Sequence, residues 1–176
     1  MNRKTFLIFS ALMVSAIVFF ESCSSDDDDV TPPVAQEFVA DNSSFTGFMN
    51  WSLDATAFGA DPALGGMAHG GNDSTVVRNV YFKDGQDPVN GKYPQGTIIV
   101  KHSNNPDNTV NEFTAMVKRG GNFNPEANGW EWFMLAPDGT IAVDAQGNLM
   151  RGAKLMDNMC TMCHTAAASK DYVFSK

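Results

Sequence analysis

Apolar and polar positions in the middle of the chain form short runs that are separated by turn residues. Four runs are rich in β-branched and aromatic residues and are bounded by Gly, Pro, Asn and Asp, a pattern typical of strands: 76–83, 96–103, 111–119 and 130–136. Pro137-Asp138-Gly139 is a tight-turn sequence, and residues 140–143 are a candidate fifth strand that follows it. Because no helical pattern separates these runs, they predict an antiparallel rather than a parallel sheet.

Two segments that flank the strands repeat apolar residues at helical spacing. The first follows N-cap side chains at 41–44 and predicts a helix over residues 43–58, whose apolar positions are Phe45, Phe48, Met49 and Leu53. The second predicts a helix over residues 152–164, on Leu155, Met156, Met159, Met162 and Cys163. The expected fold class is therefore α+β, a predominantly antiparallel β-sheet core with an N-terminal helix and a C-terminal helix.

The N-terminal region is typical of an exported protein. Arg3 and Lys4 precede an apolar run over residues 6–20, which is the pattern of a secretory signal peptide and is short for a transmembrane helix. The sequence before Cys23 resembles a bacterial lipoprotein box, although Phe20 and Glu21 depart from the usual residues. An ordinary signal peptide and an uncleaved anchor are the alternatives. We expect a signal peptide over residues 1–22 and a lipid anchor on Cys23.

A block of four aspartates, residues 26–29, follows Cys23. Like charges repel one another and stay solvated, so residues 23–37 are expected to form a disordered acidic tether. Residues 38–176 then form one domain, because a chain of 176 residues is too short for two ordinary domains. The formal net charge of −8 excludes nucleic-acid binding through phosphate contacts, and it is compatible with a basic redox carrier as partner.

The sequence Cys160-Thr161-Met162-Cys163-His164 is a C-x-x-C-H motif, which is typical of covalent haem c attachment in exported proteins. Each thiol would add to one vinyl group of a single haem, and His164 would become the proximal iron ligand. A zinc half-site is one alternative, but zinc needs four ligands and the sequence has no second C-x-x-C or H-x-x-x-H. A thioredoxin-type disulfide is another, but no βαβ pattern precedes the motif.

Several segments together resemble the cytochrome P-460 family and its sister group, the β-type cytochromes c′: residues 78–81, 93–101, 116–119, 129–132, 160–164 and 171–174. The resemblance implies an antiparallel β fold that holds one haem, with a five-coordinate iron and an open distal side. It also implies chemistry on small nitrogen compounds. Members that resemble cytochrome P-460 oxidise hydroxylamine and carry a lysine joined to the haem. The β-type cytochromes c′ lack this link and bind nitric oxide.

The resemblance also implies roles for individual residues. Lys101 aligns with the cross-linking lysine, and Lys92 and Lys118 are the competing candidates. Arg78 would place a cation over the distal face of the haem. Possible distal bases for deprotonating bound hydroxylamine are Glu126 and Glu131, and each is also compatible with an ordinary structural role.

His69, in a loop rich in Gly, Asp and Asn, is interpreted as an ordinary loop histidine rather than a distal ligand.

The sequence therefore leaves two hypotheses. One is an oxidoreductase that acts on hydroxylamine or nitric oxide, and the other is a non-catalytic haem lipoprotein that binds nitric oxide or transfers electrons. In both, the expected location is the bacterial outer membrane, on its periplasmic or cell-surface side, with contact to the membrane through the lipid anchor alone. The sequence leaves open whether the domain forms a homodimer.

Overall fold

The computed structural model describes residues 36–59 and 74–175. The chain divides into a unit of residues 1–32 and a unit of residues 33–176, and all described residues belong to the second unit. The predicted signal peptide, Cys23, most of the tether and His69 lie outside the described residues. Within the part that is described, no helix is both long and apolar enough to cross a membrane.

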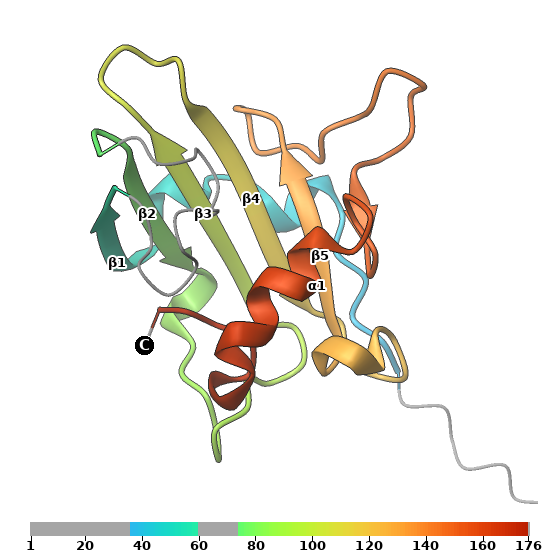
Figure 1. The fold of residues 1–176 in the computed structure, drawn as a ribbon. Helices are drawn as coiled ribbons and strands as arrows, with labels where there is room; N and C mark the ends of the chain where they lie inside the picture. The colour runs from blue at the N-terminus through green and yellow to red at the C-terminus, as the bar shows by residue number, and fades with distance from the viewer. Residues whose placement is uncertain (1–35, 60–73, 176) are drawn as a thin grey trace, which may run out of the picture. The chain divides into compact units, whose positions relative to one another are not determined.

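The centre of the domain is a six-stranded sheet in which each strand pairs antiparallel with the next strand along the chain (Figure 1). The strands are β1 (Ser52–Phe58), β2 (Val77–Phe82), β3 (Ile98–Asn104), β4 (Asn111–Lys118), β5 (Trp130–Leu135) and β6 (Arg151–Gly152). The predicted antiparallel core is confirmed, and its four main strands lie where the apolar runs placed them.

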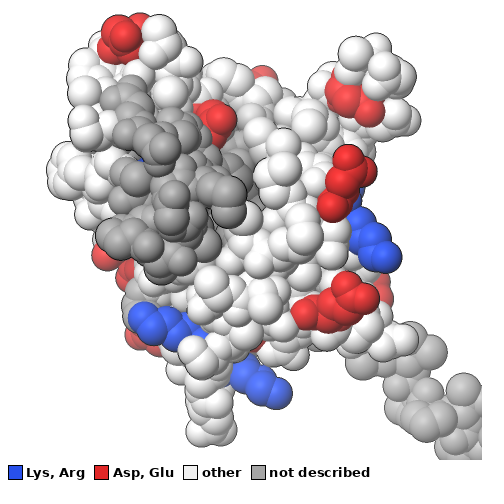
Figure 2. Space-filling model, viewed as in Figure 1, with Lys and Arg blue, Asp and Glu red and all other residues white. Residues whose placement is uncertain are grey.

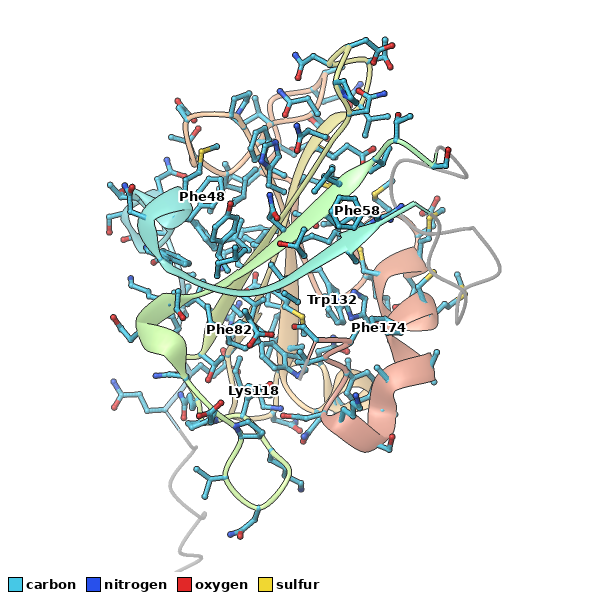
Figure 3. The ribbon with its side chains drawn as sticks, turned by 90° about the vertical axis from the view of Figure 1, so that its left-hand side faces the viewer. Phe48, Phe58, Phe82, Lys118, Trp132 and Phe174 are labelled. Carbon is cyan, nitrogen blue, oxygen red and sulfur yellow. The ribbon has the colours of Figure 1, made fainter. Side chains whose placement is uncertain are left out.

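Side chains alternate along each strand, so the sheet buries two separate apolar clusters. One face carries Ile98, Val100, Phe113, Val117 and Phe133, which pack against the N-terminal segment. The other face carries Ile99, Met116, Trp130 and Trp132, which pack against Leu155 and Cys160 of the C-terminal segment. We call the second face the motif face and the first the opposite face. In Figure 3, Phe48 and Trp132 lie on the two sides of the sheet.

The predicted helix over residues 43–58 is wrong. In its place the chain forms two short 3-10 turns, η1 (Asn42–Phe45) and η2 (Phe48–Asn50), and then strand β1. Gly47, between the two turns, has a φ of 69° and Trp51 is extended, so no continuous helix can run through the segment. Phe45 and Phe48 are nonetheless buried in the core of the opposite face.

The predicted C-terminal helix is present but shorter than expected. Helix α1 (Met159–His164) continues into the 3-10 helix η6 (Thr165–Lys170). Residues Met156, Asp157 and Asn158 have φ values of 53°, 53° and 67°, and three successive left-handed residues are incompatible with an α-helix. The apolar repeat had extended the prediction back to residue 152, which instead belongs to β6.

Turns and short 3-10 helices connect the strands. Two of these helices are η4 (Lys83–Gly85) and η5 (Pro125–Ala127). Residues 140–143 do not form the predicted fifth strand: Ile141 makes an isolated bridge to Leu135. Gly129 ends the connection before β5 with a φ of 81°, and a Cβ atom there would lie 3.2 Å from the backbone of Gly120. This close approach requires glycine.

Candidate haem site

Helix α1 carries the three residues of the motif on little more than one turn. Cys160 and Cys163 are half-buried and are not joined in a disulfide. The buried side chain of Thr161 fixes the helix to the sheet, because its Oγ1 atom accepts a hydrogen bond of 2.9 Å from Trp132 Nε1. The motif is therefore held against β5 on the motif face.

His164 is oriented by one hydrogen bond and two aromatic rings. Its Nδ1 atom lies 2.7 Å from the main-chain oxygen of Tyr172. Because a carbonyl oxygen only accepts, Nδ1 carries the proton and Nε2 is left as the ligand atom. The ring centroid lies 4.7 Å from that of Trp132 and 5.3 Å from that of Phe174 (Figure 3).

Burial lowers the pKa of His164 to about 4, and the charge of Lys101 acts in the same direction, while the hydrogen bond to Tyr172 opposes them. The imidazole is therefore neutral near pH 7, as an iron ligand must be. Two thiols separated by two residues, beside a neutral imidazole with Nε2 available, form the donor set that haem c requires. These side chains fit the group that the motif predicts.

Lys101 lies on the motif face. It is half-buried on β3, where it follows the inward-facing Ile99 by two positions and pairs across the sheet with Val80 and Thr114. Its charge lowers the pKa of His164, and it also acts against the burial that raises the pKa of the Cys160 thiol. Lys101 is thus close enough to the motif to act on two of its three functional groups.

The two competing lysines occupy different places. Lys92 is exposed in the turn that its main chain closes with Val89. Lys118 is buried on β4, where its Nζ atom lies 2.8 Å from both carboxylate oxygens of Asp171 (Figure 3). Of the three lysines, Lys101 combines proximity to the motif with partial exposure.

Arg78 shares the motif face with Lys101. It is buried and pairs with Ser103, which in turn pairs with Glu112, so the three residues form one row across β2, β3 and β4. The Ser103 hydroxyl is fully buried, and no hydrogen-bond partner for it is found among the residues that the structure describes. Sequence reasoning missed Ser103 and Glu112, although a strand period of two from Lys101 would have placed Ser103 on its face.

The two proposed acids are not brought to this row. Glu126 is exposed on η5, and only its main-chain oxygen contacts the C-terminal segment, where it accepts a hydrogen bond of 2.7 Å from the Tyr172 hydroxyl. Glu131 is buried on the opposite face, two positions before Phe133 along β5 and in the same phase, and its oxygens lie 2.8 Å from Arg151. The Glu126 side chain is therefore exposed to solvent, and the Glu131 carboxylate lies on the other side of the sheet from the motif.

The surface around α1 has no concentrated charge. Figure 2, from the same side as Figure 1, shows acidic and basic side chains in small separate groups around a largely uncharged area. Across residues 36–59 and 74–175, no group of three or more His, Cys, Asp and Glu side chains is arranged to hold a metal ion.

An antiparallel meander with a C-x-x-C-H helix on one face defines a cytochrome that is built on a β-sheet rather than on a helical bundle. The Cytochrome P460 family model matches residues 47–175, which include all six strands and the motif. The chain therefore belongs to the cytochrome P460 family, and it is a haem-binding cytochrome. Comparison with curated proteins found no match, and comparison with solved structures found none.

Proposed function

We propose that this protein is a mono-haem c-type cytochrome that acts on small nitrogen species, by hydroxylamine oxidation or nitric oxide chemistry. The haem would be joined to Cys160 and Cys163, with His164 as the proximal ligand and an open distal side. The observation that carries the proposal is the position of Lys101, on the same sheet face as the motif and close enough to shift the pKa values of His164 and Cys160.

The side chains have separate roles in this proposal. A bound haem supplies an iron centre that exchanges electrons and binds a small ligand. His164 holds the iron through Nε2, with its ring oriented by Tyr172 and Trp132. We assign Lys101 to the lysine–haem link of hydroxylamine-oxidising family members. Arg78 would supply a cation and hydrogen-bond donors to a bound nitrogen compound.

A non-catalytic haem lipoprotein, which binds nitric oxide or transfers electrons, is the second candidate. The placement of the acids favours it, because Glu126 is exposed and Glu131 faces the other side of the sheet. A hydroxylamine oxidase needs a group to take up protons from its substrate. On the motif face, Glu112 is the acid nearest in register to Arg78 and Lys101.

One experiment separates the two candidates. The exported protein is purified, its ferrous absorption spectrum is recorded, and its haem peptide is weighed after proteolysis. A red-shifted Soret band and a Lys101 peptide joined to the haem support the oxidase. A haem held by two thioethers alone, with an ordinary spectrum, supports the second candidate.

The matched variants are Lys101→Leu and Lys92→Leu. In the oxidase, Lys101→Leu converts the spectrum to the ordinary type and abolishes hydroxylamine oxidation, while Lys92→Leu changes neither, because Lys92 is exposed in a turn. A spectrum unchanged in Lys101→Leu refutes the assignment of the cross-link. A preparation without covalent haem refutes both candidates.

We also propose that Cys23 is lipidated and that the protein is anchored to the outer membrane by that lipid, where a redox carrier would exchange electrons with it. The N-terminal sequence supports this location. Fractionation tests it: Cys23→Ser should move the haem protein from the membrane to the aqueous fraction. Recovery of the variant with the membrane would refute lipid anchoring through this residue.

A further inference from the structure

A buried ion pair between Lys118 and Asp171 lies at the motif face, next to Tyr172. Asp171 and Lys118 are 3% and 6% exposed, and both carboxylate oxygens of Asp171 lie 2.8 Å from Lys118 Nζ. A buried ion pair carries a large desolvation cost, and burial lowers the pKa of Lys118 despite the attraction of Asp171. Such a pair contributes little net stability compared with an apolar pair of similar volume, which points to a role other than stability.

Asp171 is the centre of a larger network. Its carboxylate also accepts hydrogen bonds from the Tyr93 main-chain N–H, at 2.8 Å, and from the Asn128 side-chain amide. Its main-chain oxygen accepts a hydrogen bond of 2.7 Å from Trp130 Nε1. Three segments that are distant in the sequence therefore converge on Asp171, at Tyr93, at Lys118 and at 128–130, and they fix its backbone as well as its side chain.

The backbone at this point is unusual. Asp171 and Tyr172 have φ values of 54° and 67°, and two successive left-handed residues that are not glycine persist only when their surroundings hold them. The main-chain oxygen of Tyr172 is the atom that accepts the hydrogen bond from His164 Nδ1. The conformation of the turn at Asp171 and Tyr172 therefore sets the direction of the proximal hydrogen bond.

We propose that Asp171 and Lys118 are positioning residues for the proximal ligand. Their ion pair holds the left-handed turn, the turn aims the Tyr172 carbonyl, and the carbonyl fixes the tautomer and orientation of His164. This inference rests on the proposed ligation of iron by His164. Sequence reasoning treated Lys118 only as a competing cross-link candidate and gave Asp171 no role.

The consequence is electronic as well as structural. A firm hydrogen bond from Nδ1 makes the imidazole more basic, and a more basic ligand stabilises the oxidised iron. Weakening the bond should raise the reduction potential and lower the iron–histidine stretching frequency. Loss of such supporting partners typically costs about 10–100-fold in metal affinity or activity. A tenfold change in the one-electron equilibrium of the iron would correspond to a shift of about 59 mV.

The experiment compares Asp171→Asn and Lys118→Met in the complete haem protein with a matched control. Glu131→Gln is the control, because Glu131 is an equally buried carboxylate that is paired with Arg151 on the opposite face. Asn128→Gly is a milder variant that removes one hydrogen-bond donor to Asp171. Glycine tolerates the φ of 48° at this position, so the backbone should not be strained. Each protein is examined by spectroelectrochemistry, by resonance Raman spectroscopy of the ferrous state, and by thermal unfolding.

We expect Asp171→Asn and Lys118→Met to raise the reduction potential and lower the iron–histidine frequency, and Asn128→Gly to shift both in the same direction by less. Glu131→Gln should lower the unfolding temperature and leave both haem readouts unchanged. Variants that lose stability but keep the wild-type potential and frequency would overturn the positioning role. If Asp171→Asn and Lys118→Met fail to fold, unchanged readouts in Asn128→Gly overturn it. A wild-type protein without an iron–histidine band would instead overturn the proposed ligation by His164.

Discussion

Substituting Glu131 by Gln tests the arrangement of the two sheet faces. Glu131 is 2% exposed, and its two carboxylate oxygens each lie 2.8 Å from the Arg151 guanidinium. Arg119 Nη1 lies 3.4 Å from one of the same oxygens. Arg151 also donates to the main-chain oxygen of Ala40, at 2.6 Å, so the cluster ties the N-terminal segment to the sheet.

The expected loss of unfolding free energy follows from the burial of the Glu131 ion pair. Removing one partner of a fully buried pair costs about 3–5 kcal/mol. The side chains of Arg119 and Arg151 keep 22% and 18% of their exposure, so water can partly solvate the charges that remain. The glutamine carbonyl can still accept one hydrogen bond from Arg151. We therefore expect a loss of roughly 2–3 kcal/mol of unfolding free energy, which for a domain of this size lowers the Tm by about 6–10 °C.

Urea unfolding followed by circular dichroism measures the free energy, and the absorption spectrum of the haem is recorded on the same samples. The spectrum and any hydroxylamine oxidation should remain at the wild-type level, because Glu131 faces away from α1. A loss below about 0.5 kcal/mol would be the value of an ordinary surface substitution and would refute the burial argument. Loss of oxidation in a fully folded variant would mean that the carboxylate acts at the haem after all.

Three further substitutions probe the anchoring of the motif and the closure of the sheet. Thr161→Val should cost about 1–3 kcal/mol in urea unfolding, because the buried Trp132 N–H loses its acceptor; an unchanged midpoint would show that Trp132 finds another partner. Gly129→Ala should cost roughly 1–2 kcal/mol, since its φ is 81° and the new Cβ would meet the Gly120 backbone at 3.2 Å; a more stable variant would contradict this. Phe45→Ala should cost about 3–5 kcal/mol in the same measurement, because Phe45 is fully buried, and a loss below about 1 kcal/mol would contradict its place in the core.

The strands were predictable because burial on both faces leaves a strong local signal. Five of the six residues of β5 are apolar, as are the first three residues of β3, and turn residues bound both strands. The N-terminal segment was not predictable in the same way. The spacing of three between Phe45 and Phe48 fits an α-helix and also fits two 3-10 turns, and only the left-handed backbone of Gly47 distinguishes them.

The site was predictable as far as its chemistry is local in the sequence. The spacing of Cys160, Cys163 and His164 alone identifies them as a haem-attachment motif. The residues that support His164 could not be identified in this way. Asp171 contacts Lys118 across 53 residues of sequence, and no short sequence motif indicates such a contact. The pairing of Glu131 with Arg151 is equally non-local, so a buried glutamate in a strand could not be assigned to either face from composition.

The position of the motif after all six strands has a structural reason. The contacts that hold α1 and the turn after it are made to β4 and β5, through Thr161 with Trp132 and Asp171 with Lys118. Both strands have paired neighbours on each side and precede the motif in the chain, so the C-terminal segment docks on a rigid surface that is already complete. Lys101, one strand further along the same face, can then be held at a fixed place relative to His164, which a site built on loops would not provide.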